Sequence, residues 1–393
     1  MNFKKCINNN NLMLTDYREA TVVDLVRTIY NKCGGTSFQY NDKMRELGKY
    51  IKGKKHILFI LSDGMGSNII NKLSNESILK KNKIRDIQTV NPSTTGCAIP
   101  SILTGQYPEK HGILGWLSYY REKSIEYFPV LFQERRTGKN LSSFGIKESD
   151  IYKYKSILNY INREVYALFP NYIKDSEFSK FALNTDNRLG YSTMSEAFEI
   201  FKTKIAKSVG TTFTYMYLPD VDSNSHRFGV YSEEVKKVIN SIELELEHIN
   251  TEENIEIIIT ADHGQINVNE KGLKIDLKKY NNFFYALPGI DSGTATYYIK
   301  ENKREKFEKA FSQDFRDKMF LFKTEELILN KVFGPNELSN YMKSNLGEYI
   351  SICKQGIYLI NCENEDEVLN NLKGTHSGFS KDEIMVPLII INM

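Results

Sequence analysis

Six residues that can bind divalent metal ions lie in three short segments of the chain and at one isolated position. They are Asp63, Asp222, His226, Asp262, His263 and His376. Zinc and similar ions take carboxylate oxygens and neutral imidazole nitrogens as ligands, and a catalytic site leaves one coordination position open. Two such ions side by side can steady the attacking and the leaving oxygen of an in-line displacement. These residue types therefore predict a site for a pair of divalent ions.

The spacing of these residues makes some segments stronger indications of a metal site than others. Asp222 and His226 are four positions apart, which places both on one face of a helical turn, although an exposed helix often shows the same pattern. Asp262 and His263 directly follow the apolar run 257–259, so a charged pair must be accommodated close to the core. Because the segments occur together, a metal site is favoured over a set of unrelated surface positions.

A further segment, Pro92-Ser93-Thr94-Thr95-Gly96, supplies hydroxyl groups that a metal pair could activate. An alcohol is a poor nucleophile at neutral pH, and coordination to a divalent cation lowers its pKa. The bare backbone of Gly96 lets its amide approach an anion closely. The stretch 98–103 is expected to be helical, and a helix N-terminus there would favour a negatively charged group.

The metal-binding segments end, or closely follow, runs of β-type apolar residues. Strands are expected over 57–61, 86–90, 212–218, 256–261 and 384–391, and amphipathic helices over 20–33 and 232–248. This alternation predicts an α/β fold with a doubly wound, mostly parallel sheet flanked by helices. Open α/β sheets bind ligands at the carboxyl ends of their strands, so the predicted metal ligands share one edge of the sheet.

Three parts of the chain are expected to pack as separate units. They are an N-terminal helical arm over 1–50, a catalytic α/β core over 51–270 plus 374–393, and an inserted α+β cap subdomain over 271–373. Within the cap we expect strands over 294–299 and 357–360 and helices over 303–311 and 365–372. The stretch 116–188 is rich in Tyr, Ser and Lys and is expected to be a long, partly helical excursion over the strand ends.

Composition excludes several classes of partner. The 52 basic and 49 acidic residues give a net charge of +3 without a basic block, which argues against binding to a nucleic-acid polymer. Five scattered cysteines without a CxxC pair favour a reducing compartment. We see no signal peptide, and the longest apolar runs have the length of strands. The sequence therefore predicts a cytoplasmic protein that does not bind a membrane, and it leaves the oligomeric state open.

In their order along the chain, these segments resemble the alkaline phosphatase superfamily, most closely its nucleotide pyrophosphatase/phosphodiesterase (type I phosphodiesterase) branch. The resemblance covers about 57–265 and returns at His376. Family members carry an Asp after the first strand, a Thr or Ser nucleophile, an Asp-x-x-x-His segment, an Asp-His-Gly segment and a distant His. Aligning 101–105 and 107–112 with the family pattern selects Thr95 as the nucleophile over Thr94 and Ser93.

The resemblance implies a ligand set and an activity. One ion would be bound by Asp222, His226 and His376, and the other by Asp63, Asp262, His263 and the Thr95 oxygen. Three imidazoles favour zinc, with Mn²⁺ as an alternative. The implied activity is hydrolysis of a phosphodiester or pyrophosphate bond in a small molecule, with a nucleotide as the expected type of substrate. It would pass through a covalent phospho-threonine that water then cleaves.

Some features differ from the family pattern, and other classes of protein are alternatives. Known members carry an aromatic residue directly after the nucleophile, which stacks on the base, and Gly96 stands there instead. Trp116, Tyr119 and Tyr120 could supply a stacking face, although a role in the core is expected more strongly. The superfamily also contains phosphomonoesterases, sulfatases, phosphonate hydrolases and mutases. The stretch 97–101 lacks the sequence motif in which sulfatases convert a Cys or Ser to formylglycine. A non-catalytic binding protein is a further alternative.

Three other positions have less specific interpretations. Family members place a Pro directly before the ligand Asp. In this chain Val221 precedes Asp222, and Pro219 precedes Asp220, so Asp220 is a second but weaker candidate ligand. His111 is expected to be a structural histidine with satisfied hydrogen bonds. His56, at the start of a strand beside two lysines, is expected at the solvent edge.

Overall fold

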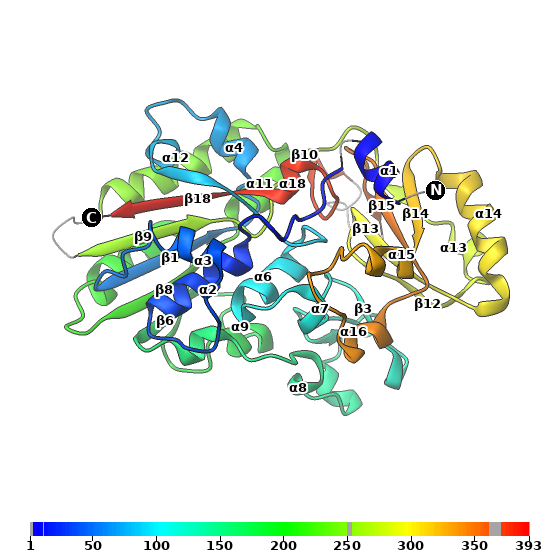
Figure 1. The fold of residues 1–393 in the computed structure, drawn as a ribbon, viewed down its shortest axis with the longest axis horizontal. Coiled ribbons are helices and arrows are strands. Elements are labelled where there is room, and N and C mark those ends of the chain that lie inside the picture. Colours follow the sequence, from blue (N-terminus) through cyan, green and yellow to red (C-terminus); the bar gives the residue numbers. More distant parts are fainter. Residues whose placement is uncertain (1–2, 11, 250–253, 361–370, 393) are drawn as a thin grey trace.

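The computed structural model describes residues 3–10, 12–249, 254–360 and 371–392. The chain builds a large α/β body around a seven-stranded sheet, and a smaller four-stranded antiparallel sheet lies beside it (Figure 1). The candidate site residues lie between these two parts of the molecule. None of the helices in the described ranges is both long and apolar enough to cross a membrane.

The central sheet is mostly parallel. Its strands, in spatial order, are β2 (Lys83–Gln88), β18 (Met385–Asn392), β9 (Ile255–Thr260), β1 (His56–Ser62), β8 (Thr212–Leu218), β6 (Glu164–Pro170) and β7 (Arg188–Tyr191). Only β18 among them runs antiparallel to its neighbours, which are β2 and β9. The predicted α/β fold with a mostly parallel sheet is therefore confirmed, and each of the five predicted strands overlaps a strand of this sheet.

The sequence explains why β1 and β9 lie in the centre. Every residue of both strands is buried, and nearly continuous apolar runs are typical of parallel strands that are covered on both faces. Leu61 of β1 pairs with Tyr217 of β8 on one side and with Thr260 of β9 on the other. The three strands therefore end side by side, and the segments that follow them share one edge of the sheet.

Helices flank the sheet, and several have the caps that their sequences suggest. Helix α2 (Val22–Lys32) begins with a capping box in which Thr21 and Asp24 bond each other's backbone. Helix α12 (Glu233–Glu247) is capped by Ser232. Further α-helices of this part are α3 (Asp42–Leu47), α4 (Ser67–Lys72), α5 (Ile78–Lys81), α6 (Thr95–Thr104), α7 (Pro108–His111), α8 (Glu148–Ile151), α9 (Glu177–Ala182), α10 (Met194–Ile200), α11 (Asp220–Phe228) and α18 (Lys381–Ile384). Helix α1 (Phe3–Asn9) lies beside the smaller sheet (Figure 1).

The stretch 116–188 is only in part the helical excursion that was predicted. It contributes β6 to the central sheet, where the apolar run 165–169 is buried against β8. It also forms a three-stranded antiparallel sheet from β3 (Ser118–Tyr120), β4 (Ile125–Phe128) and β5 (Gln133–Glu134). The stretch is partly helical, as predicted, in α8 and α9. The strand β6 was missed because its short apolar run is surrounded by polar and tyrosine-rich sequence that hides its strand pattern.

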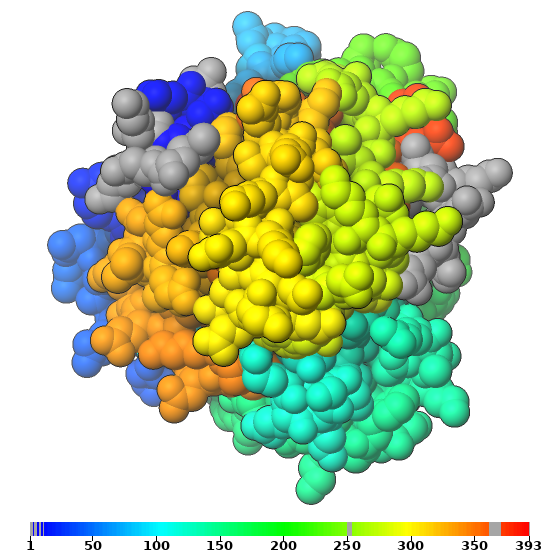
Figure 2. Space-filling view, turned by 90° about the vertical axis from the view of Figure 1, so that its right-hand side faces the viewer, coloured from blue at the N-terminus to red at the C-terminus, as the bar shows by residue number. Residues whose placement is uncertain are grey.

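The smaller sheet contains β12 (Phe284–Ile290), β13 (Thr294–Ile299), β15 (Tyr349–Cys353) and β14 (Met319–Lys323), in that spatial order. Helix α14 (Arg304–Phe315) packs Phe307 and Phe311 against Tyr297 in a hydrophobic cluster separate from the main core. Figure 2 shows this region, in yellow and orange, forming one face of the molecule. The strand predicted over 294–299 and the helix predicted over 303–311 are present.

Shorter elements connect this sheet to the core. They are α13 (Leu277–Tyr280), α15 (Thr324–Leu329), α16 (Asn340–Asn345), β10 (Ile266–Asn267), β11 (Leu273–Lys274), β16 (Leu359–Ile360) and β17 (Gly374–Thr375). Of the strand predicted over 357–360, only β16 is formed. Most of the helix predicted over 365–372 lies outside the described residues. At the other end of the chain, Phe3 of α1 packs edge-on against Phe322 of β14, with ring centroids 5.0 Å apart.

Candidate active site

Three of the predicted segments leave neighbouring strands of the central sheet at the same edge. Asp63 follows β1, Asp262 follows β9 after one residue, and Asp222 lies in α11, which follows β8. The Asp63 backbone N–H donates to the Leu218 carbonyl over 2.9 Å. Gly64 then turns with a φ of +71°, and a Cβ at this position would lie 3.0 Å from Cβ of Asp222. A residue without a side chain is therefore needed where the β1 turn meets α11.

Thr95 is the hydroxyl residue of its segment that lies with the metal-binding side chains. It is the first residue of α6, and its Oγ1 lies 3.0 Å from Nε2 of His263 and 3.4 Å from Oδ1 of Asp63. The other two hydroxyl groups point elsewhere, because Ser93 donates to the Gly378 carbonyl and Thr94 donates to Asp291. The geometry thus separates three residues that spacing alone could not.

The first group of potential metal ligands combines Asp63, Asp262 and His263, whose ligand atoms all lie within 4.8 Å of one another. Nε2 of His263 is 3.3 Å from Oδ1 of Asp63 and 3.4 Å from Oδ2 of Asp262. All three side chains are buried. This group contains the three carboxylate and imidazole residues that the family resemblance assigned to one ion.

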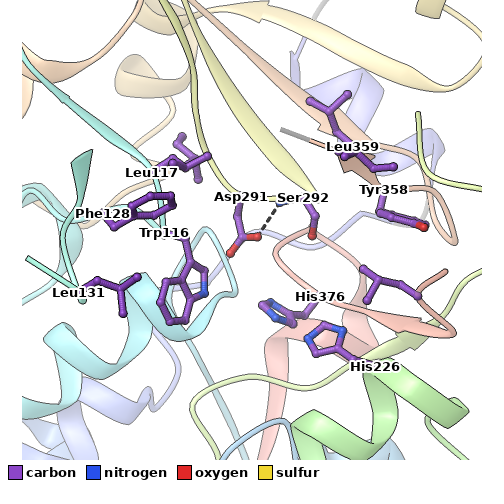
Figure 3. Close-up of a pocket in the computed structure, with 13 residues that line it drawn as sticks. Trp116, Leu117, Phe128, Leu131, His226, Asp291, Ser292, Tyr358, Leu359 and His376 are labelled. Atoms are coloured by element: carbon purple, nitrogen blue, oxygen red, sulfur yellow. Dashed lines mark hydrogen bonds between the residues drawn. The ribbon is translucent and has the colours of Figure 1, made fainter. Parts of the chain in front are cut away.

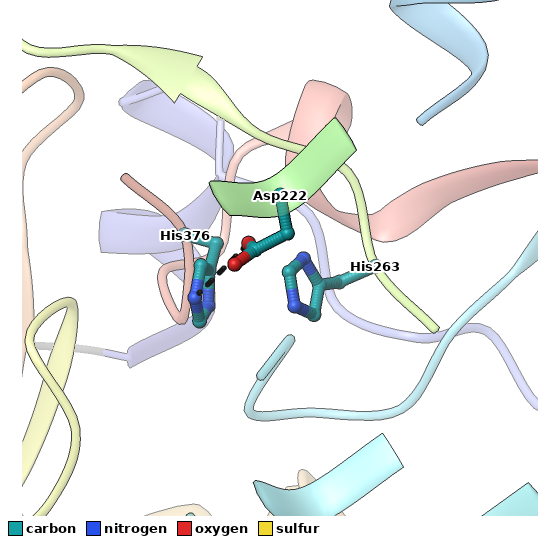
Figure 4. Close-up of side chains that lie close together, drawn as sticks. All are labelled: Asp222, His263 and His376. Carbon is teal, nitrogen blue, oxygen red and sulfur yellow. Dashed lines mark ion pairs between the residues drawn. The ribbon is translucent and has the colours of Figure 1, made fainter. Parts of the chain in front are cut away.

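The second group combines Asp222, His263 and His376 (Figure 4). Nε2 of His376 lies 3.8 Å from Oδ1 of Asp222, and the rings of His376 and His263 stack. His226 lies outside this group but beside it, with Nε2 3.3 Å from Oδ1 of Asp222. The resemblance assigned His226, rather than His263, to this ion. In the structure His263 stands between the two groups.

Neighbouring groups hold these side chains in place. Nδ1 of His226 lies 2.9 Å from the Gly374 carbonyl, which fixes Nε2 as the nitrogen facing Asp222. The Tyr217 hydroxyl donates to Oδ2 of Asp63 over 2.5 Å, and the Gln265 amide donates to Oδ1 of Asp222. Sequence reasoning missed both Tyr217 and Gln265. Their positions at the end of β8 and directly after Asp-His-Gly are the signal that could have found them.

The site concentrates negative charge in a buried space. Burial, together with the neighbouring Asp262 and Asp222 charges, raises the pKa of Asp63 well above its usual range. Burial also raises the pKa of Asp262. Burial opposes the charged form of Asp222 as well, but the nearby His226 and His376 hold the pKa of that carboxyl below its usual range. In turn, Asp222 outweighs burial and raises the pKa of His226 to about 9.

The chemistry of these donors fits a pair of divalent cations. Oδ2 of Asp262 and Nδ1 of His376 are buried without a hydrogen-bond partner. Within the described ranges, the ion pairs of Asp63, Asp222 and Asp262 are made to histidines and not to Lys or Arg. Buried carboxylates are costly unless a cation compensates them. A metal ion would supply that charge and would also satisfy the unpartnered oxygen of Asp262.

Two cavities meet at the candidate site. One, of about 370 Å³, is lined by Asp63 and Thr95 and by aromatic side chains that include Phe169 and Tyr172. The other, of about 440 Å³, is lined by Asp291 and hydrophobic residues (Figure 3). Both are lined by Trp116, Leu131, His226 and His376. The site can therefore accommodate substituents on two sides of a group held between the histidines and Thr95.

Of the aromatic residues considered for stacking, Trp116 is the one that reaches the cavities. Tyr119 and Tyr120 are buried, and Tyr119 packs against Tyr298 with ring centroids 5.1 Å apart. The structure also explains why a glycine follows Thr95. A Cβ at Gly96 would lie 2.5 Å from the Gly115 carbonyl carbon, so this position cannot carry the aromatic residue of known family members.

The predictions for two other histidines have different outcomes. His111 is buried, its Nε2 lies 2.8 Å from the Ser101 hydroxyl, and its Nδ1 accepts the Ile113 N–H over 3.1 Å, which confirms a structural role. His56 is fully buried, with Nδ1 2.9 Å from the Thr212 hydroxyl, so its prediction as a solvent-edge residue was wrong. The pairing of β1 with β8 covers it.

Comparison with known proteins gives the class that this fold and site define. Residues 57–379 match the family model of type I phosphodiesterases and nucleotide pyrophosphatases. The chain therefore belongs to the type I phosphodiesterase/nucleotide pyrophosphatase family, and it is a hydrolase of that type. The resemblance inferred from the sequence motifs is confirmed. No curated protein matches the chain in a sequence comparison.

Solved structures with the same fold include two forms of the murine ectonucleotide pyrophosphatase/phosphodiesterase 5 and its human counterpart. The murine protein has 16% sequence identity and a TM-score of 0.63, over 84% of this chain and 87% of that chain. The human protein has 17% identity and a TM-score of 0.62, over 85% and 87%. An inactive threonine-to-alanine variant of the murine protein, in complex with AMP, has 16% identity and a TM-score of 0.61, over 84% and 87%.

Proposed function

We propose that this protein is a two-metal phosphodiesterase that uses Thr95 as its nucleophile. The observation that carries the proposal is the convergence of the Thr95 hydroxyl with both groups of potential ligands, 3.0 Å from His263, at one edge of the sheet. The proposed metal ligands are Asp63, Thr95, Asp222, His226, Asp262, His263 and His376. Zinc fits the three imidazoles best, and Mn²⁺ is the alternative.

The proposed reaction begins with an attack by Thr95. When bound, the two ions supply positive charge that lowers the pKa of the threonine hydroxyl and offsets charge on the phosphoryl oxygens. A bond forms between Oγ1 of Thr95 and phosphorus, and the bond from phosphorus to the leaving alcohol breaks. Water then cleaves the resulting phospho-threonine and restores the hydroxyl. An inactive murine relative that binds AMP carries alanine in place of a threonine, which supports a threonine nucleophile.

The start of α6 offers donors for the phosphoryl group. The N–H groups of Cys97 and Ala98 both donate to the Thr94 carbonyl. In the described part of the chain, no hydrogen-bond acceptor is found for the N–H groups of Thr95 and Gly96. Free N–H groups at a helix N-terminus favour an anion. We infer that these two amides bind a phosphoryl oxygen while Thr95 attacks.

A diester is the proposed substrate because the site opens into two cavities. A monoester would fill one of them, whereas a diester has an organic group for each. The AMP complex of the murine relative supports a small nucleotide-type ligand. The cap, proposed as residues 271–373, contributes Asp291 and Ser292 to one cavity and would shape substrate choice there. The N-terminal arm over 1–50 and the core over 51–270 plus 374–393 complete the proposed division.

A cytoplasmic location remains a prediction. The described cysteines Cys6, Cys33, Cys97 and Cys353 are all buried free thiols, which agrees with a reducing compartment. The solved relatives are ectonucleotide enzymes by name and lend this location no support.

The function is tested by comparing hydrolysis of bis-p-nitrophenyl phosphate with that of p-nitrophenyl phosphate, with added Zn²⁺ or Mn²⁺ and with a chelator. We expect faster cleavage of the diester, lost on chelation and restored by metal. Preference for the monoester would assign the protein to phosphomonoesterase chemistry. Hydrolysis that the chelator leaves unchanged would contradict the metal-dependent mechanism, and absence of activity on both substrates would favour a mutase or a binding protein.

A further inference from the structure

The turn between β12 and β13 brings the smaller sheet into contact with the nucleophile segment. Ile290, at the end of β12, has a φ of +80°, which is unusual for a β-branched residue and marks a position held by its surroundings. Its N–H donates to the Leu117 carbonyl over 2.7 Å and its carbonyl accepts the Leu117 N–H over 3.0 Å. The Asp291 N–H donates to the Thr294 carbonyl over 2.9 Å, which closes the turn.

The Asp291 carboxylate connects this turn to the residue before the nucleophile. Its Oδ2 accepts the Thr94 hydroxyl, and its Oδ1 accepts the Ser292 N–H over 2.6 Å. Figure 3 shows Asp291 between Trp116 and the histidines of the site. Asp291 and Thr94 are 197 positions apart in the sequence, so this bond ties the inserted region directly to the segment that carries Thr95.

The hydrogen bond to Asp291 gives the Thr94 hydroxyl a different partner from that of a usual N-cap residue. Thr94 is the N-cap residue of α6, and an N-cap threonine usually accepts a backbone N–H of the first turn with its hydroxyl. The Thr94 side chain makes no such cap, because its hydroxyl donates to Asp291 instead. The start of α6 is therefore positioned from outside the helix, by a residue of the turn.

The same turn also contacts the segment that carries His376. The Gly293 N–H donates to the Ser377 hydroxyl and the Thr294 hydroxyl donates to the Ser377 carbonyl, each over 2.6 Å. Ser377 in turn donates its N–H to the Ser93 carbonyl over 2.8 Å. A Cβ at Gly293 would lie 2.5 Å from the Gly378 nitrogen. The turn, the nucleophile segment and the His376 segment thus form one closely packed unit.

We propose that Asp291 is a positioning residue for the Thr95 nucleophile, acting through its hydrogen bond to Thr94. This inference rests on the proposed function, because it assigns Asp291 to the reaction that Thr95 carries out. Asp291 holds the Thr94 hydroxyl, Thr94 begins α6, and Thr95 is thereby kept 3.0 Å from His263. The inserted region would then support catalysis itself and not only cover the site.

Two substitutions remove the bond from opposite ends. D291L keeps the branched shape of the side chain without a hydrogen-bond acceptor, and T94V keeps the shape of threonine without the hydroxyl. We expect each to lower kcat for bis-p-nitrophenyl phosphate on the order of 10- to 100-fold, the scale of small misplacements of a reacting group. KM should stay within about twofold, and the metal content per chain should match the wild type. T94S, which keeps the hydroxyl, should retain most of the activity.

The double variant D291L/T94V measures whether the two residues act together. If they do, it should be no slower than either single variant, because the same bond is lost once. Additive losses would overturn the proposal, and so would wild-type kcat in D291L. D317L is a matched control, since Asp317 is an exposed carboxylate of the same inserted region. If D291L does not fold, T94V and T94S carry the test alone with the same expected results.

Crystal structures of the wild type and D291L give a readout that does not need activity. We expect Oγ1 of Thr95 to move out of hydrogen-bonding distance of His263 in D291L. An unchanged Thr95 position would overturn the positioning role. If the wild type cleaves neither test substrate, the proposed function fails, while this comparison still decides whether Asp291 positions Thr95.

Discussion

The imidazole rings of His263 and His376 stack with their centroids 3.9 Å apart and their planes inclined by 21°. Two positively charged rings are disfavoured at this distance in a buried site. Burial, followed by the influence of His263, lowers the pKa of His376 well below its usual range. The stack therefore favours neutral imidazole, which is the form that binds metal ions.

Replacement of Thr95 tests the proposed nucleophile. T95A removes the hydroxyl that lies 3.0 Å from His263, so we expect kcat for bis-p-nitrophenyl phosphate to fall by at least about 10³-fold, the scale for loss of a catalytic nucleophile. Six of the seven proposed ligands remain, so bound metal should be largely kept. T95S keeps a hydroxyl and should retain measurable turnover. Full activity in T95A would show that the nucleophile is wrongly assigned.

The Asp262 carboxylate is expected to serve metal binding at the expense of stability. It is fully buried, and its Oδ2 has no hydrogen-bond partner. In D262N the retained oxygen can still accept the N–H groups of Gly64 and His263, while one buried charge is removed. With chelator present we expect D262N to be more stable than the wild type by roughly 0.5–2 kcal/mol, a common trade-off at functional sites.

Denaturation by urea, with chelator and with added Zn²⁺, checks this prediction. Metal should stabilise the wild type by mass action, by about 2.7 kcal/mol at a concentration 100 times Kd, and should stabilise D262N less, because this variant has lost a charged ligand of one ion. The order of the two proteins should therefore reverse between the two conditions. A D262N variant that is less stable than the wild type in both conditions would contradict the prediction.

The metal-binding segments could be predicted from sequence because each follows a strong strand pattern. The residues after β1, β8 and β9 meet because the carboxyl ends of parallel strands share an edge. His376 carries no such pattern, and its inclusion rested on the family resemblance. The central sheet was predicted for the same reason, apart from β6 and β7. The apolar run of β6 is short and lies within polar sequence.

The roles of Tyr217, Gln265 and Asp291 were missed for a different reason, although Tyr217 and Gln265 lie in segments that the motifs mark. Their roles depend on single hydrogen bonds to Asp63, Asp222 and Thr94, which are 154, 43 and 197 positions away. Neither spacing nor local pattern encodes such contacts. The choice of Thr95 needed the family pattern, because residue type and spacing do not show which of the hydroxyl groups of Ser93, Thr94 and Thr95 faces the metal-binding side chains.

His111 should make stability depend on pH. Burial lowers the pKa of His111 to about 3, whereas the ordinary value in the unfolded chain is about 6.5. Above about pH 6.5 both states are neutral and its interactions contribute fully. As the pH falls toward 3, the unfolded state gains a proton that the folded state does not, so stability is lost at up to about 1.4 kcal/mol per pH unit.

The variant H111N isolates this effect. Its oxygen can accept the Ile113 N–H in place of Nδ1, and it does not titrate. We expect H111N to be less stable than the wild type at pH 8, because the contact with Ser101 is lost, and the difference to shrink as the pH is lowered from 7 to 5. Urea denaturation at each pH measures it. A difference that stays constant over this range would exclude His111 as a source of the pH dependence.

Trp116 should report on ligand binding. It is the single tryptophan of the chain and lines both cavities at the site. A group that enters either cavity changes the surroundings of its ring, so AMP added to the metal-loaded T95A variant should alter the tryptophan emission. W116F provides the background. Binding of AMP in equilibrium dialysis without any change in emission would place the nucleotide outside these cavities.

Gly96 should be intolerant of any side chain. A Cβ there would lie 2.5 Å from the Gly115 carbonyl carbon, and a Cβ at Gly115 would lie 2.7 Å from the Ile290 carbonyl oxygen. Three backbone segments are therefore in contact, and none can yield without moving another. G96A is expected to cost about 1–3 kcal/mol of stability, as overpacking does, and to reduce kcat because Thr95 is its neighbour.

Gly210 offers the matched control for this substitution. No heavy atom lies within 4 Å of a Cβ built there, so G210A should change neither the free energy of unfolding nor kcat. Urea denaturation and diester hydrolysis, measured on both variants, separate local crowding from a general effect of Gly→Ala. If G96A matched G210A in both measurements, the contact between α6 and Gly115 could not be the reason that glycine, and not an aromatic residue, follows Thr95.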